Sequence, residues 1–221
     1  MSILENYDKN NSNSLRAKVF NQLQNDILNG KYKQGSSLIE TKLSEDMGVS
    51  RTPIREAIKQ LELEGLVQTV PHKGVVVKGI SSKDIRDIYT IRMLIEGLAA
   101  RWAAENITDE ELNELQEAVD LEEFYTNKND SQHLLKFDSR FHEIIFNASK
   151  SKPLKQILST FHNYVQRARN ASLGSPSRAR EALKEHKATL QAIKEKDPDK
   201  AEKLTTEHIK NASKYLLKQQ F

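Results

Sequence analysis

The chain has 221 residues, and its 34 Lys and Arg against 31 Asp and Glu leave a net charge of only +3. At roughly 150 residues per domain, this length suits one large or two small domains. Because the net charge is small, a surface that binds a polyanion must be a local arrangement of basic side chains. The absence of cysteine excludes disulfides and thiol chemistry and fits a reducing cytoplasm. No apolar run approaches the ~18 residues of a membrane span, so we expect a cytoplasmic protein without membrane association.

Residues 1–13 are polar and rich in Asn and Ser. They contain neither the apolar core of a signal peptide nor that of a membrane anchor, and we expect a disordered arm. The next region, 14–79, is predicted to begin with helices over 15–29 and 40–47. Gly48 permits the positive φ of a tight turn. Thr52 is the predicted N-cap of a third helix that starts at Pro53. Two short helices joined by a glycine turn are typical of a helix-turn-helix.

After Gly65 the pattern changes from helical to extended. Residues 66–70 and 75–78 are rich in β-branched side chains, and the segment Pro71-His72-Lys73-Gly74 between them is a predicted hairpin tip. A helix-turn-helix followed by a hairpin is a winged helix. Lys73 at the tip is placed to reach phosphate or the minor groove of DNA.

Arg51 and Arg55 flank the start of the third helix and point away from its apolar stripe of Ile54, Ala57 and Ile58. Cations are disfavoured at a helix N-terminus. An anionic partner would compensate, and nucleic acid is one such partner. The alternative is a solvated helix with two surface arginines.

Residues 80–221 show no strand pattern. Turn and capping signals separate six predicted helices, at 82–106, 108–125, 131–148, 153–171, 177–196 and 198–218. We therefore expect a mainly α protein, in which a winged helix-turn-helix over 14–79 precedes an all-α bundle over 80–221.

An aspartate and three histidines lie on predicted inner faces of three bundle helices: Asp138, His142, His186 and His208. Asp138 and His142 are i, i+4 neighbours, so their side chains project together. Buried groups of this kind are costly without partners. A hydrogen-bonded Asp–His pair and satisfied core histidines are one interpretation. The other is one divalent transition metal per chain, with zinc first and nickel or manganese as alternatives, because imidazole with one carboxylate suits these ions.

Arg92 lies on the inner stripe of the first bundle helix, between Ile88 and Ile95. It can form an internal ion pair with Glu96 at i+4. Alternatively, it can anchor a small carboxylate near the metal, because a guanidinium binds a carboxylate in a bidentate fork.

Two sets of residues resemble a known family. The run from Gly48 to Ile58, with Leu61, Glu64, Gly65 and Leu66, resembles the winged-helix signature of GntR-family bacterial transcription regulators. Asp138-x-x-x-His142 with His186 and His208 resembles the metal site of the FCD ligand-binding domain of the FadR subfamily, in its six-helix form. The resemblance covers about residues 14–218.

The resemblance implies a homodimer that binds two-fold symmetric operator DNA and responds to a small organic acid. It implies DNA contacts by residues of the third helix and the wing, namely Ser50, Arg51, Thr52, Arg55, His72, Lys73 and Gly74. The chain departs from the family at Thr41, where many members have arginine, and Lys42 can replace that contact.

Three functions are open at this point. The first is a non-enzymatic transcription regulator whose operator binding is modulated by an organic acid at the metal. The second is a metal-dependent enzyme with an accessory winged helix, although no glutamate is forced toward the site as a general base. The third is a regulator that senses the metal itself.

Overall fold

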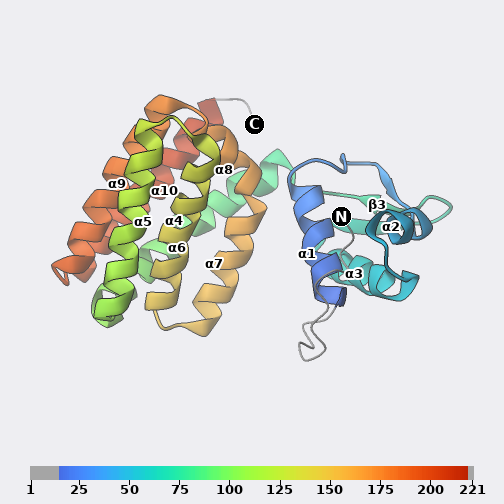
Figure 1. The fold of residues 1–221 in the computed structure, drawn as a ribbon, viewed down its shortest axis with the longest axis horizontal. Coiled ribbons are helices and arrows are strands. Elements are labelled where there is room, and N and C mark those ends of the chain that lie inside the picture. Colours follow the sequence, from blue (N-terminus) through green and yellow to red (C-terminus); the bar gives the residue numbers. More distant parts are fainter. Residues whose placement is uncertain (1–14, 219–221) are drawn as a thin grey trace. The chain divides into compact units, whose positions relative to one another are not determined.

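The computed structural model describes residues 15–218, so the arm predicted over 1–13 lies outside the described residues. The chain divides into two compact units, the first ending at Ser81 and the second starting at Ser82 (Figure 1). Within 15–218, none of the helices has the length and apolar character that crossing a membrane requires.

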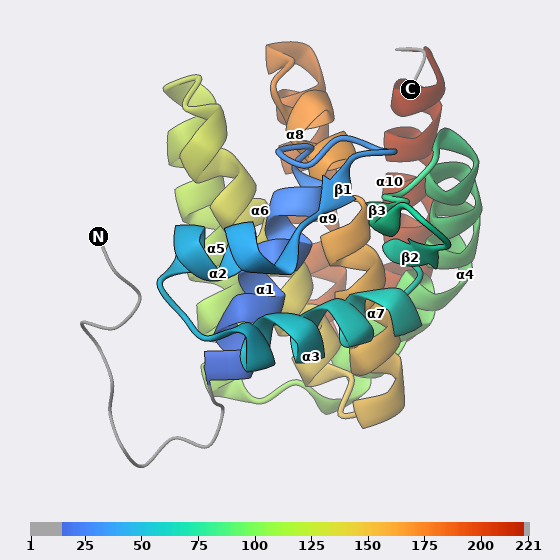
Figure 2. The same ribbon diagram turned by 90° about the vertical axis from the view of Figure 1, so that its right-hand side faces the viewer.

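The first unit is a winged helix, as predicted. It contains α1 (Leu15–Leu28), α2 (Glu40–Met47), α3 (Arg51–Leu63) and a small sheet of β1 (Ser37–Leu38), β2 (Val67–Val70) and β3 (Gly74–Val77) (Figure 2). The sheet is antiparallel in the order β1-β3-β2. The core of the unit consists of apolar residues from the helices and the base of the wing, including Val19, Leu23, Ile54, Leu61 and Leu66. The sequence analysis predicted no strand at β1, because two residues are too few to show a pattern.

The turn between α2 and α3 depends on Gly48, which has a φ of 64°. In this left-handed conformation the N–H groups of Gly48 and Val49 donate to carbonyls in the last turn of α2. Helix α3 then starts earlier than predicted, with Ser50 rather than Thr52 at the N-cap. Pro53 is therefore the third helical residue, where its missing N–H still has no intrahelical acceptor to lose.

The second unit is all helical. It contains α4 (Ser82–Asn106), α5 (Asp109–Asn127), α6 (Ser131–Ala148), α7 (Lys152–Tyr164), α8 (Gln166–Leu173), α9 (Pro176–Lys194) and α10 (Pro198–Lys218), which pack side by side (Figure 1). Thr108 and Glu111 form a complete capping box at the start of α5. Helices α4 and α10 approach closely at Gly97, where an added Cβ would lie 2.4 Å from Thr206 Oγ1.

The prediction of a single helix over 153–171 is wrong. This segment forms two helices, α7 and α8, which are separated at Val165, whose φ of −94° and ψ of 7° interrupt the helix. No glycine or proline marks the break in the sequence. Val165 is fully buried, and Arg169 of α8 lies in the bundle core, where it pairs with Asp138. Tertiary burial therefore overrides the local helical pattern.

Candidate metal centre and nucleic-acid interface

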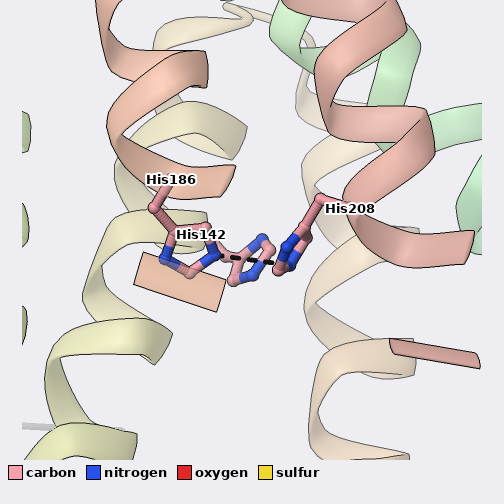
Figure 3. A group of neighbouring side chains, drawn as sticks. All are labelled: His142, His186 and His208. Atoms are coloured by element: carbon pink, nitrogen blue, oxygen red, sulfur yellow. Dashed lines mark hydrogen bonds between the residues drawn. The ribbon is translucent and has the colours of Figure 1, made fainter. Parts of the chain in front are cut away.

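Three buried histidines converge inside the bundle. His142 comes from α6, His186 from α9 and His208 from α10, and one ring nitrogen of each lies within 4.8 Å of the others. Their rings turn toward one another (Figure 3). The Nε2 atoms of His186 and His208 are 3.3 Å apart. The helical periodicity that predicted three inward-facing histidines thus leads to one compact cluster.

Each of the three rings has a carboxylate at its other nitrogen. Nδ1 of His186 is 2.8 Å from Glu122 of α5, and Nδ1 of His208 is 2.7 Å from Glu185 of α9. Nδ1 of His142 lies 3.1 Å from Glu96 of α4. A metal-binding histidine characteristically donates its second N–H to a carboxylate, which fixes the tautomer and aims the remaining lone pair. The sequence reasoning assigned none of these three glutamates to the metal site.

The electrostatics favour neutral rings at two of the three histidines. Burial lowers the pKa of His142 despite the nearby Glu96 carboxylate. Burial together with the neighbouring His186 lowers the pKa of His208 to about 3. At His186 burial acts in the same direction, but the Glu122 carboxylate outweighs it and raises the pKa.

The carboxylates beside His142 and His208 are ionised at neutral pH. Burial opposes their charge, but their cationic and imidazole partners outweigh it and lower the pKa of both Glu96 and Glu185 to about 2. An ionised carboxylate only accepts hydrogen bonds. For His208, whose Nδ1 is hydrogen-bonded to Glu185, the proton of the neutral ring therefore lies on Nδ1, and Nε2 offers a lone pair.

The cluster offers donor atoms that could hold a transition metal. When His186 is protonated on both nitrogens, its Nε2–H donates to Nε2 of His208; when His186 is neutral with its proton on Nδ1, the two Nε2 lone pairs face each other and a cation can lie between them. Two nitrogens bound ~2.0–2.1 Å from a tetrahedral zinc are roughly 3.3 Å apart, the separation found between these rings. Imidazole nitrogens backed by carboxylates are the donor set that zinc, nickel and related ions prefer.

Asp138 lies beside this cluster rather than within it. Its Oδ2 is paired with Nη2 of Arg169, a residue that the sequence analysis did not single out. A second group of possible ligand atoms joins Asp138 with Glu122 and His186. The arginine lowers the pKa of Asp138, although burial opposes this effect. The carboxylate is therefore ionised and close to the histidines.

A small cavity of about 20 Å³ adjoins the histidines and is lined by Tyr89, Arg92, Asp138, Arg169 and Arg178, among others. That volume admits roughly one water molecule.

Both interpretations of Arg92, an internal ion pair with Glu96 and an anchor for a small carboxylate, remain supported. The guanidinium pairs with Glu96 through Nε, yet its Nη1 has no hydrogen-bond partner among the described residues. Arg178 pairs with Glu185 through Nη2 at 2.8 Å.

The charges around the histidines balance while His186 and Glu122 share a proton, because the pKa of each is raised. Three arginines and four carboxylates occupy this part of the core, among the side chains that the structure describes: Arg92, Arg169, Arg178, Glu96, Glu122, Asp138 and Glu185. With that proton on His186 or Glu122, positive and negative charges are equal in number. A divalent cation that displaces the proton would leave one positive charge in excess, and a single bound carboxylate would then neutralise it. Buried charge is costly unless it is compensated.

Two other histidines of the bundle behave differently. His133 is exposed and pairs with Asp130, as expected of a surface residue. His162 lies close to the site, with its ring centroid 5.3 Å from that of His142. Nε2 of His162 contacts Arg169. His162 is thus part of the surroundings of the cluster.

The predicted DNA contacts all lie on the surface of the first unit. Ser50, Arg51, Thr52 and Arg55 are exposed at the start of α3, and Thr41 and Lys42 are exposed on α2. The tip of the wing is also exposed. There His72 and Gly74 have positive φ angles, and the N–H of Lys73 closes the turn onto Val70.

The anion that compensates Arg51 and Arg55 lies within the chain itself. Glu40, the first residue of α2, accepts hydrogen bonds from both arginines. The sequence reasoning placed the arginines on the surface correctly but did not consider this partner.

Comparisons with known proteins agree with both units. Residues 15–77 match the model of bacterial regulatory proteins of the gntR family, and residues 87–211 match the FCD domain. The chain is 30% identical over 212 residues to the galactonate operon transcriptional repressor of Escherichia coli, covering 86% of this chain and 91% of that protein. It is 29% identical to the HTH-type transcriptional regulator YdhC of Bacillus subtilis, covering 90% of this chain and 89% of the relative. The solved structure of E. coli McbR/YncC matches with a TM-score of 0.79 and 25% identity, over 94% of this chain and 99% of that one.

Proposed function

Because the chain belongs to the GntR family of DNA-binding transcription regulators and carries an FCD domain, we propose that a small organic acid at a metal site in the bundle controls its operator binding. Residues 14–79 read double-stranded operator DNA, and residues 80–221 hold the metal, the acid and the dimer contacts. Such a regulator works in the cytoplasm, where bacterial DNA lies.

The observation that supports a metal most directly is the carboxylate behind each histidine. His142, His186 and His208 are the proposed ligands. Asp138 is the proposed fourth, since its ionised carboxylate lies beside them and can be shared with Arg169. A divalent ion such as zinc, nickel or manganese supplies a Lewis-acidic centre that binds carboxylate oxygens.

Arg92 is the proposed anchor of the organic acid. Its unpartnered Nη1 lines the same cavity as Asp138 and His142. Arg178, buried in that lining, is a second candidate. The excess positive charge that a metal would create here favours an anion over a neutral ligand. An acid that touches several helices at once can bias their packing, and through it the spacing of two DNA-reading units.

The proposal requires that the metal transmit the response to the acid. A thermal-shift screen of the metal-loaded chain with acetate, lactate, citrate and galactonate should find a binder, because a ligand at 100 times its Kd stabilises the native state by ~2.7 kcal/mol. Galactonate is included because one relative is named for that operon. We expect the binder to change operator affinity by ~5–150-fold, the usual range of allosteric coupling.

The same titration after chelation provides the test. Stripped protein should still bind operator DNA but should no longer respond to the acid. Linkage also requires operator DNA to change the affinity of the acid by the same factor. An undiminished response in the stripped protein would place the effector pocket elsewhere. A response to metal with no response to any acid would favour a metal sensor.

We also propose that the regulator is a homodimer, as two-fold symmetric operators require. Helix α4 offers an apolar surface for this purpose, because Leu94 and Ile91 are 73% and 42% exposed on one face. Leu94→Arg should place a charge in that contact and raise the dimer dissociation constant by roughly tenfold or more, since burying an unpaired charge costs several kcal/mol. Sedimentation equilibrium measures this constant.

Ile157→Arg is the matched control for the dimer experiment. Ile157 is 48% exposed on α7, so the same kind of substitution there should leave the dimer intact. Equal dissociation constants for wild type and Leu94→Arg would exclude this face of α4 from the interface.

A further inference from the structure

Arg51 and Arg55 converge on a single carboxylate. Nη2 of Arg55 lies 2.9 Å from Oε2 of Glu40, and Nε of Arg55 lies 3.2 Å from both carboxylate oxygens. Nη2 of Arg51 donates to the same Oε2 at 3.2 Å. One negative charge therefore joins the two cations at the start of α3.

The side chains of Arg51, Arg55 and Glu40 differ in how many of their polar atoms remain available to another partner. Arg55 directs its Nε and Nη2 edge at Glu40, which leaves Nη1 and the outer edge of the guanidinium for another partner. Arg51 uses only Nη2. Both arginine side chains are more than half exposed, whereas that of Glu40 is 26% exposed. The carboxylate thus lies behind the arginines and leaves their outer atoms accessible.

The position of Glu40 keeps it charged and in place. It is the first residue of α2, and a carboxylate in the first turn of a helix is stabilised by the helix dipole. Its hydrogen bond from Arg55 lowers its pKa. It also has no competing role as a cap, because Ile39 occupies the N-cap position.

We propose that Glu40 is a positioning residue that sets the sequence specificity of DNA binding. This inference rests on the proposed DNA contacts of Arg51 and Arg55. Glu40 holds the guanidinium groups of Arg51 and Arg55 in place before DNA binds. Less side-chain entropy is therefore lost when one of these groups forms a bidentate contact with a guanine edge. The same negative charge weakens the attraction of the two arginines for phosphates of any sequence. Glu40 therefore raises the ratio of specific to non-specific affinity.

The test compares Glu40→Gln with wild type on two duplexes. One is selected from a random library by the wild-type full-length protein, and the other is a scrambled version of it. We expect Glu40→Gln to bind the scrambled duplex several-fold more tightly and to lose about tenfold in the affinity ratio, within the range of one arginine–base contact. The salt dependence on the scrambled duplex should steepen by about one unit.

Two further variants isolate the cause. Glu45→Gln removes the same charge from an exposed site on α2 and should keep the wild-type ratio. Glu40→Asp keeps the charge on a shorter side chain, so it should restore weak binding to the scrambled duplex but not the full ratio. Unaltered thermal unfolding of Glu40→Gln confirms that the fold is intact.

The outcomes distinguish the proposed role of Glu40 from the proposed DNA contacts of Arg51 and Arg55, on which it rests. If Arg51→Ala with Arg55→Ala leaves affinity for the selected duplex unchanged, the proposed arginine contacts are wrong. If that pair of substitutions weakens binding but Glu40→Gln has the wild-type ratio, the contacts are right and the role of Glu40 is refuted. An equal loss of ratio in Glu45→Gln also refutes it, because the effect would then come from net charge alone.

Discussion

Replacing His186 and His208 together by alanine is expected to reduce the bound transition metal from about one ion per chain to none. The substitution removes two of three imidazole donors, whereas loss of even an outer hydrogen-bonding partner typically costs 10–100-fold in metal affinity. Elemental analysis after dialysis measures occupancy. Full occupancy in this double variant would refute the site.

Two controls accompany the metal experiment. His133→Ala removes an exposed histidine outside the cluster and should leave the metal content unchanged. Glu122→Gln keeps all three histidine rings, and its amide oxygen can still accept a hydrogen bond from Nδ1 of His186. It therefore tests the site without deleting a ligand. We expect its metal affinity to fall by roughly 10–100-fold. Operator binding by the double variant shows whether the winged helix stays folded.

The pH dependence of metal binding should identify His186 as the ligand that protonates first. Metal binding requires neutral imidazole, so affinity falls as pH falls. Burial holds the pKa of His142 and His208 below the ordinary value, whereas Glu122 raises that of His186. Proton competition therefore begins at His186. Glu122→Gln removes the charge that stabilises its imidazolium, so the pH at which the metal affinity of this variant starts to fall below its own value at neutral pH should be lower than in wild type.

The second large effect is expected at the start of α3. Arg51→Ala should cost ~1–3 kcal/mol of specific DNA binding if the side chain reads a base, and the double variant with Arg55→Ala should cost more. Binding to the selected duplex, measured by fluorescence anisotropy, gives the loss. Arg51→Lys distinguishes base reading from simple attraction, because lysine keeps the charge and loses the bidentate fork.

Arg16→Ala is the matched control, since Arg16 is a half-exposed arginine on α1 and its removal changes the charge of the first unit equally. It should leave specific binding close to wild type. Lys73→Ala at the wing should instead weaken all sequences alike and reduce the salt slope by about one. If the double arginine variant matches the affinity of wild type, the assignment of α3 as the reading helix fails.

Local patterns in the sequence predicted most of the architecture. The change from a helical pattern to β-branched runs after Gly65 located the wing, and Gly48 marked the turn before α3. Spacing of i, i+4 placed Asp138 and His142 on one inner face of α6, where both are buried. These features depend on residues within a few positions of one another, so the local sequence is enough to predict them.

The partners of those residues were decided by the tertiary structure. Periodicity shows which face of a helix turns inward, but not which helix meets that face. Glu122 and His186 are 64 residues apart, and Arg169 is 31 residues from Asp138. The helix break at Val165, between α7 and the helix that carries Arg169, also has no local signal. Glu40 and Arg55 meet because the α2–α3 turn folds one helix start against the other. The sequence by itself therefore predicted the candidate ligands and the candidate DNA-reading helix, whereas packing between distant segments determined the charges that surround them.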